Sequence, residues 1–239
     1  MCRVSAKFVP RLLTDDQKEN RVEISQELLA NANGNENFLK NIITGDETWV
    51  YECDVETKMQ SSRWIGKGFP RPKKARMSRS KMLLVVYFDW KGIVHNEFVP
   101  RGRMVNKQLY QEVLARLGDA VCRKRPDLWE NQTWMLHHDN APAHASLLFP
   151  SYLAKYKTSV VLHSPYSPNL TPAEFFLFPK LNTTLKGRRF QTIEEIQENA
   201  IRELCAITES AFQEAFQEQK KCRERCIASR GDYFAGDSA

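Results

Sequence analysis

The sequence lacks any apolar run long enough to cross a bilayer. A membrane-spanning helix needs roughly 20 consecutive apolar residues, and no stretch of this 239-residue chain comes near that length. The first residues, MCRVSAKFVPRLL, show no apolar core followed by a small-residue cleavage site, so we predict no signal peptide. Internal repeats and low-complexity tracts are also missing. A membrane protein, a secreted precursor and a solenoid are therefore not expected.

Paired C-x-x-C spacing is missing as well. Six cysteines are scattered along the chain, at positions 2, 53, 122, 205, 222 and 226. Cys222 and Cys226 lie four apart on an expected helix, but no second ligand pair with zinc-site spacing accompanies them. We predict reduced thiols in a cytosolic or nuclear protein.

Neither sign of charge dominates. Lys and Arg number 35 against 29 Asp and Glu, a net charge of +6, while 42% of residues are hydrophobic and 10% aromatic. Such a composition is typical of a globular enzyme rather than a disordered chain. The modest excess permits a polyanionic partner without requiring one, so the distribution of the charge matters more than its sum.

That distribution is uneven, because residues 61–81 form a basic segment. Gly66, Gly68, Pro70 and Pro72 interrupt it and predict an extended loop rather than a helix. The loop holds no acidic residue between its first and last cation, which favours contacts with phosphates; a merely solvated loop is the alternative. The candidate DNA-binding residues are Arg63, Lys67, Arg71, Lys73, Lys74, Arg76, Arg79 and Lys81.

Hydrophobic periodicity predicts the order of the elements. A helix over 14–33, with an apolar stripe of Val22, Ile24, Leu28 and Leu29, precedes a strand over 41–53. A hairpin of 82–89 and 93–99 turns at 90–92. Then follow a helix (106–124), a strand (133–139), a helix (143–155), a strand (159–163) and helices over 172–186, 192–207 and 209–228. This α/β order predicts an RNase H-like fold, a mixed five-stranded sheet with flanking helices.

Three acids stand where this topology can bring them together. Asp46 lies in the first strand, Asp139 ends the fourth, and Glu174 starts the helix after the fifth. Phosphodiester cleavage needs an activated oxygen nucleophile and a stabilised leaving oxygen, and two Mg²⁺ ions held by a few carboxylates can supply both. We therefore predict that all three are catalytic metal ligands, with Asp46 bridging the two ions.

Each acid also has a structural explanation. Asp46 suits a turn at a strand start, Asp139 a helix cap, and Glu174 the favourable first turn of a helix. The sequence leaves open whether Asp46 or Glu47 faces the site, because neighbouring strand residues point to opposite faces. His137, His138 and His144 invite a zinc interpretation, but adjacent histidines on a strand should diverge, and we do not expect zinc.

Several motifs together resemble those of mariner transposases. WMLHHDNAPAH (134–144) is similar to their second-aspartate motif, YSPNLTPAEFFLFPK (166–180) to their third-carboxylate motif, and TGDETW (44–49) to the first. FVPRLL (8–13) resembles the linker before the catalytic domain, and GRRF (187–190) and GDYF (231–234) also look like the family. The resemblance runs from about residue 4 to the C-terminus.

The resemblance implies a DDE/D-type catalytic core that cleaves DNA and transfers strands, using two Mg²⁺ or Mn²⁺ ions. It further implies a nuclear protein that pairs transposon ends and target DNA as a homodimer, with no membrane partner. The basic segment 61–81 corresponds to the family's clamp loop. We expect residues 1–36 to form a linker and short helix, and 37–239 the catalytic domain.

Departures from the family pattern support a rival interpretation. Glu174 stands where mariner members usually carry Asp, Asn169 replaces an Asp, and the helix-turn-helix region that recognises transposon ends is expected to be missing. We predict an endonuclease-type enzyme without end recognition. The alternatives are a transposase-derived protein that binds DNA and dimerises without catalysis, and an RNase H-type nuclease acting on RNA–DNA hybrids.

Overall fold

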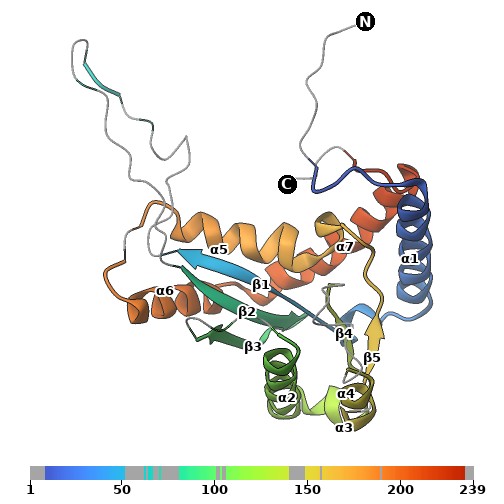
Figure 1. The fold of residues 1–239 in the computed structure, drawn as a ribbon. Coiled ribbons are helices and arrows are strands. Elements are labelled where there is room, and N and C mark those ends of the chain that lie inside the picture. Colours follow the sequence, from blue (N-terminus) through green and yellow to red (C-terminus); the bar gives the residue numbers. More distant parts are fainter. Residues whose placement is uncertain are drawn as a thin grey trace, which may run out of the picture.

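The structure, a computed structural model, describes residues 9–51, 62, 64–66, 70, 81–100, 103, 106–139, 149–156, 158–188 and 190–234, with 149–152 described in backbone only. Its centre is a five-stranded sheet in the order β3-β2-β1-β4-β5 (Figure 1). The strands are β1 (Ile42–Tyr51), β2 (Lys81–Asp89), β3 (Gly92–Val99), β4 (Met135–His137) and β5 (Ser159–Val161). β2 runs antiparallel to β1 and β3, whereas β4 is parallel to both β1 and β5. The predicted mixed sheet is confirmed.

The predicted hairpin is β2 and β3, joined at Trp90 and Lys91. Gly92 closes the turn with φ +132°, a backbone conformation that side chains with a Cβ rarely adopt. The Asp89 carboxylate accepts hydrogen bonds from the backbone N–H groups of Lys91 and Gly92, at 2.9 and 3.0 Å. It also accepts from Arg125 at 2.9 Å, so one buried acid ties the turn to the helix beyond it.

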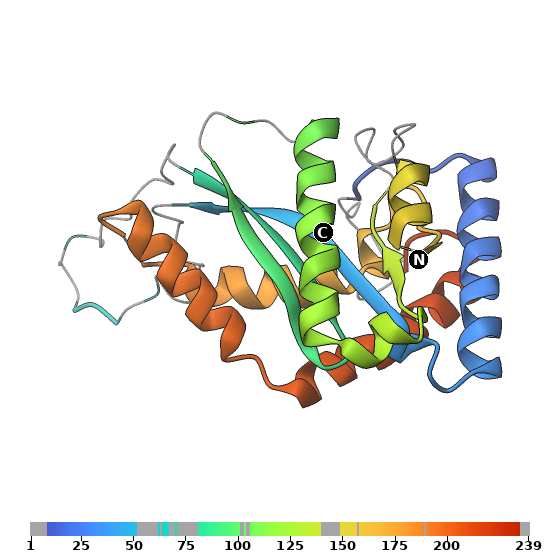
Figure 2. The ribbon, with the colours of Figure 1, turned by 90° about the horizontal axis from the view of Figure 1, so that it is seen from below.

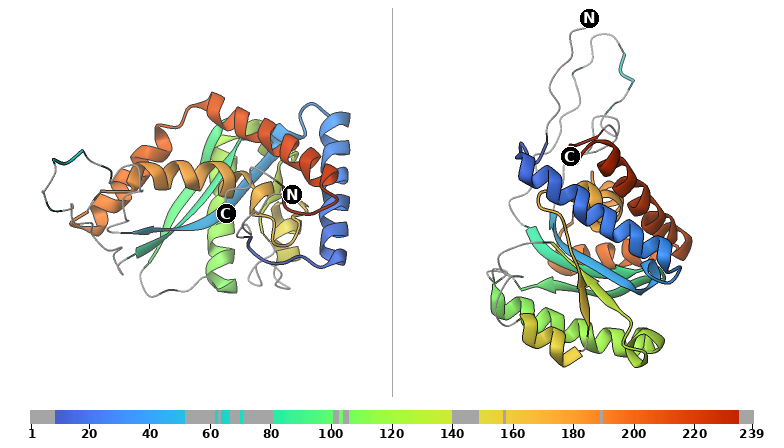
Figure 3. Two further views of the ribbon diagram at one scale, coloured as in Figure 1. Left: turned by 90° about the horizontal axis from the view of Figure 1, so that it is seen from above. Right: turned by 90° about the vertical axis from the view of Figure 1, so that its right-hand side faces the viewer.

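Helices cover both faces of the sheet. α2 (Lys107–Lys124), α3 (Pro126–Glu130) and α4 (Phe149–Tyr156) lie against one face, where α2 crosses the strands in the view from below (Figure 2). α5 (Phe178–Leu185), α6 (Ile193–Cys205) and α7 (Glu209–Ala228) cover the other, seen from above in Figure 3. α1 (Asp15–Gly34) packs along α7, and a short turn, η1 (Leu39–Asn41), leads into β1. No helix in these described ranges is long and apolar enough to span a membrane.

Strand alternation divides the core between the two faces. On the α2 face, Ile43, Val85 and Tyr87 pack with helix residues such as Leu114. On the opposite face, the apolar core consists of strand residues and residues of the C-terminal helices, including Ile42, Leu84, Val86, Phe88, Leu177, Phe212 and Phe216. Even-numbered residues of β1 therefore face α5, α6 and α7.

The structure corrects some predictions. The side of α1 that packs inward is Arg21, Ser25 and Leu28, so the predicted apolar stripe is wrong except at Leu28. Arg21 and Ser25 can be buried beside Leu28 because both have hydrogen-bond partners: Arg21 donates to Gly231 and Ser167, and Ser25 donates to the Arg21 carbonyl. The fourth and fifth strands are shorter than predicted, and α3, which Pro126 opens, was not expected. The start of the predicted helix over 143–155, with His144, lies outside the described residues.

Candidate active site

The register of the sheet relates the two aspartates. β1 and β4 are parallel with Thr44 opposite His137, and the Thr44 Oγ1 and His137 Nδ1 atoms lie 2.9 Å apart on one face. Asp46 and Asp139 each follow this pair by two residues, and the charge of Asp139 acts on Asp46, so the two acids lie near each other. Because side chains alternate along a strand, Asp46 shares the face of Thr44.

Glu174 comes from a turn with unusual hydrogen bonding. Residues Ala173–Leu177 (η3) form a π-helical turn that runs directly into α5, and the Phe178 N–H donates to the Ala173 carbonyl five residues back. Pro179 accounts for the wide turn, since its ring would clash with the carbonyl of Phe175 in a regular α-helix and it has no N–H to donate. Wide turns of this kind are frequent at functional sites.

The three carboxyl groups act on one another. Asp46 and Glu174 share a side-chain hydrogen bond, and the charge of Asp139 acts on both. Burial first, and then the charge of Glu47, raises the pKa of Asp46 well above its usual range. Burial and Asp139 likewise raise the pKa of Glu174: its side chain is exposed overall, but neighbouring atoms crowd its carboxylate. The result is a cluster of three crowded carboxyl groups, in which the raised pKa values of Asp46 and Glu174 show that ionisation is opposed.

The geometry also separates Asp46 from Glu47. Asp46 is opposite Val86, which belongs to the core under α5 and α7, whereas Glu47 is opposite Val85, on the α2 face. Gly45 precedes them because a Cβ there would lie 2.2 Å from the buried ring of Tyr87. A Gly-Asp pair at this point therefore meets a packing need as well as supplying the acid.

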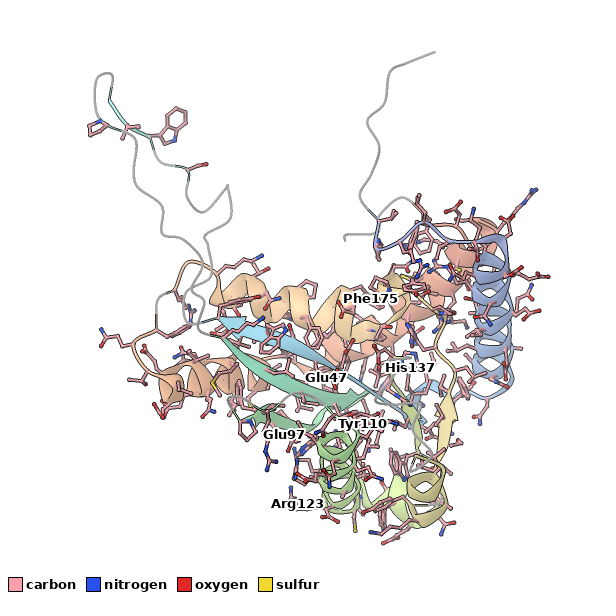
Figure 4. The ribbon with its side chains drawn as sticks, in the orientation of Figure 1. Glu47, Glu97, Tyr110, Arg123, His137 and Phe175 are labelled. Carbon is pink, nitrogen blue, oxygen red and sulfur yellow. The ribbon has the colours of Figure 1, made fainter. Side chains whose placement is uncertain are left out.

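The adjacent histidines diverge, as predicted. His137 packs edge-on against His163, with ring centroids 5.3 Å apart, while His138 Nδ1 lies 3.2 Å from the hydroxyl of Tyr110 on α2. Figure 4 labels His137, Tyr110 and Glu47 in the centre of the molecule. His137 and His163 belong to the buried wall behind the acids; burial lowers the pKa of both, that of His163 to about 3.

A loop over residues 164–171 leads to Glu174 and is held from both ends of the chain. Arg21 on α1 donates to the carbonyl of Gly231 (2.8 Å) and to Ser167 Oγ (2.5 Å). Tyr166, in the left-handed region at φ +50°, accepts at its carbonyl from the Tyr233 hydroxyl (2.9 Å) and at its own hydroxyl from Arg11 (2.6 Å). Sequence reasoning missed the role of Arg21, because no local pattern marks contacts across 145 residues or more.

Most of the candidate DNA-binding residues of the basic segment were not among those that the structure describes. Arg63, Lys67, Arg71, Lys73, Lys74, Arg76 and Arg79 lie outside the described residues. Lys81 is exposed at the start of β2, with its Nζ 3.9 Å from the centroid of the Trp49 ring. Trp49 is itself 43% exposed, so this cation and its aromatic partner face solvent where the segment joins the sheet.

The donor set suits a hard divalent cation. Carboxylate oxygens are the ligands that Mg²⁺ and Mn²⁺ prefer, and a cation between Asp46 and Glu174 would offset the burial and the nearby negative charge that raise their pKa values. Within the described part of the chain, no three His, Cys, Asp or Glu side chains already converge as a metal-binding group.

The mixed five-stranded sheet with helices on both faces defines the class of the protein. The fold matches the crystal structure of the catalytic domain of Mos1 mariner transposase with a TM-score of 0.79 and 28% identity, over 95% of this chain and 100% of that one. The fold is thus an RNase H-like DDE fold, as predicted from the order of strands and helices.

Sequence comparison narrows the class to a family. A family model described as Transposase (partial DDE domain) matches residues 54–131. The Mariner Mos1 transposase of Drosophila mauritiana is 31% identical over 231 residues, which are 95% of this chain and 66% of that protein. The crystal structure of the Mos1 paired end complex with Mg matches with a TM-score of 0.87 and 30% identity, over 98% of this chain and 68% of that one. The chain belongs to the mariner family of transposases and spans about two thirds of that relative, including its catalytic domain.

Proposed function

We propose that this chain cleaves DNA phosphodiester bonds and transfers DNA strands in a metal-dependent reaction. Asp46, Asp139 and Glu174 are the catalytic metal ligands, and the metal is Mg²⁺ or Mn²⁺, as two ions. The observation that carries the proposal is the mutual action of these three carboxyl groups, which come from segments 93 and 35 residues apart along the chain.

The chain's own residues account for several requirements of the reaction. Asp46 is fixed on the long central strand, and its neighbour Thr44 ties that strand to β4 just before Asp139. Glu174 stands at the rim and remains accessible. When bound, the divalent ions supply Lewis acidity that activates the attacking oxygen and stabilises the leaving one. Glu174 has one methylene more than the Asp usual at this place, which changes its reach but not its charge.

Cleavage of nicked and hairpin DNA by the purified chain in Mn²⁺ or Mg²⁺ tests the proposal. Asp139→Asn should reduce the rate at least about a thousandfold, because removing a metal ligand removes several kcal/mol of transition-state stabilisation. Asp119→Asn makes the same chemical change on the exposed side of α2 and should leave the rate unchanged.

The outcomes separate the proposal from its alternatives. Metal-dependent products that persist in Asp139→Asn would contradict the assignment of the acids. Retention of DNA without any cleavage by the unchanged chain would favour a transposase-derived protein that binds DNA and dimerises without catalysis. Preference for RNA–DNA hybrids over DNA would favour an RNase H-type nuclease.

The basic segment is proposed to bind the phosphates of DNA. Neutralising Lys73, Lys74 and Arg76 together should lower the slope of log K against log salt by up to about 3, since each phosphate contact contributes roughly 0.9 to it. Lys155, Lys180 and Lys221, neutralised together, remove the same charge from other parts of the surface. An equal fall in that control would remove the segment from the DNA site.

The proposed partners are transposon-end and target DNA and a second copy of the chain. One relative was solved as a paired end complex with Mg, which supports a dimeric assembly on DNA as the working state. Because the substrate is DNA, the proposed location is the nucleus.

A further inference from the structure

Arg223 on α7 is a buried cation without a counterion. Its side chain is 0% exposed, and its Nε, Nη1 and Nη2 atoms have no hydrogen-bond partner among the described residues. A guanidinium offers five N–H donors, and an unpaired buried charge costs several kcal/mol. Burial lowers the pKa of Arg223 only to about 10, so the group stays protonated at neutral pH.

Other unpaired polar groups lie on the elements that pack around Arg223. Gln219, one turn earlier on α7, donates from Nε2 to the Leu170 carbonyl at 3.3 Å and so holds α7 against the loop that carries Asn169. Both amide atoms of Asn169 and the hydroxyl of Ser164 lack partners among the described residues, as does Gln219 Oε1. Each of these side chains is at least nine-tenths buried.

Donors outnumber acceptors in this cluster. The unpaired groups that can accept are the amide oxygens of Asn169 and Gln219, the Ser164 hydroxyl and His137 Nε2. The unpaired donors are three guanidinium nitrogens of Arg223, the Asn169 amide nitrogen and one nitrogen of Arg21. With five N–H groups on Arg223 alone, these nitrogens carry more N–H groups than the acceptors have lone pairs.

The charges around Arg223 are unbalanced in the same direction as the hydrogen-bonding groups, with positive charge in excess. Arg21 is equally buried, and its charge lowers the pKa of Arg223. Among the described residues, the groups that act on Arg223 are the thiols of Cys226 and Cys222 and the guanidinium of Arg21, and none of these is a carboxylate. Arg21 has acceptors in Gly231, Ser167 and Tyr166, whereas Arg223 has none in the described ranges. A group with negative charge and acceptor capacity is what Arg223 needs.

We propose that a small inorganic anion of about the size of chloride binds between Arg223, Asn169 and Ser164, beneath α7. Small size follows from burial, since the side chains of Arg223 and Ser164 are 0% exposed and that of Asn169 is 8% exposed. The proposed anion bears on the stability of the fold, not on the binding of metal by the acids.

Thermal unfolding of the whole chain tests the proposal, in sodium chloride and in sodium gluconate at equal ionic strength. Gluconate is too large for an enclosed site, so only chloride should raise the Tm of the unchanged chain, by roughly 3–5 °C for each tenfold increase above its Kd. Arg223→Met should lose this response. Arg225→Met should retain it, because Arg225 is exposed on the same helix and pairs with Glu218 at 2.6 Å.

An equal chloride response in all three proteins would overturn the proposal, since it would reflect general salt effects. If Arg223→Met does not fold, crystals of the unchanged chain grown in sodium bromide decide the question. An anomalous bromide peak within hydrogen-bond distance of the Arg223 guanidinium supports the site, and its absence there contradicts it.

Discussion

The two faces of the sheet are covered by cores of different composition. Under α2 the core is apolar, with Leu114, Leu117 and Val121 enclosed completely. Under α7 an apolar core is joined by a layer of buried polar groups and by the acids at its edge, and several of those groups lack partners among the described residues. Packing on the α2 face serves stability alone, whereas the other face combines an apolar core with the proposed active site, where buried polar groups oppose stability.

Truncation on the apolar face should have the largest effect on stability. Leu114→Ala removes a fully buried side chain, so the free energy of unfolding should fall by about 2–5 kcal/mol. Denaturant titration measures the change, and Gln108→Ala on the exposed side of the same helix is the matched control. A loss below about 1 kcal/mol would mean that the apolar core under α2 is not tightly packed around Leu114.

Neutralising an acid on the other face should have the opposite sign. Since the pKa of Asp46 is raised in the folded state, its ionisation opposes folding above the pKa of the unfolded chain. In EDTA at pH 7, Asp46→Asn should therefore raise the free energy of unfolding by roughly 0.5–2 kcal/mol, and the gain should vanish near pH 3, where Asp46 is protonated anyway. A variant less stable than the unchanged chain at pH 7 would contradict the idea that the acids strain the fold.

The smallest effect is expected at the edge strand β3. Burial would raise the pKa of Glu97, but hydrogen bonds from His95 and Arg116 outweigh it and lower the pKa to about 2. Because that pKa is depressed on folding, Glu97 contributes stability above about pH 4.5 that is lost as the pH falls toward 2. Arg116 is 44% exposed, so solvent screening limits the contribution to about 1 kcal/mol or less.

Unfolding of Glu97→Gln and the unchanged chain at several pH values between 7 and 2.5 measures this contribution. The difference between the two proteins should narrow as the pH falls. A constant difference across the range would show that the carboxylate charge contributes nothing.

Much of the fold could be predicted from local sequence patterns. The parts that could not be predicted have one physical cause in common. Apolar periodicity predicted the hairpin and α2, where burial depends on spacing alone. The buried positions of Arg21 and Arg223 carry no local signal, because they depend on contacts between α1, α7 and the loop before Glu174.

The candidate site divides in the same way. Asp46, Asp139 and Glu174 could be named as candidates from their places within the first strand, after the fourth and at the start of a helix. The choice between Asp46 and Glu47 needed the strand pairing, which shows the face of the sheet that each side chain shares with its partner on β2. The π turn was not predicted, since Pro179 within a helical pattern indicates only that the regular helical hydrogen bonding is interrupted there, not in which way.

That wide turn has a geometric consequence for Glu174. In an unbroken α-helix, residue 174 would lie above residues 178, 181 and 185, all of which are buried, and its carboxylate would be driven into the core. The extra residue in the turn advances the helix by about 100°, so Ala173 takes the inward position and Glu174 faces outward. The direction of the third acid is thus fixed by one hydrogen bond of the main chain, and shortening the turn by a single residue would aim it at the wrong side of its own helix.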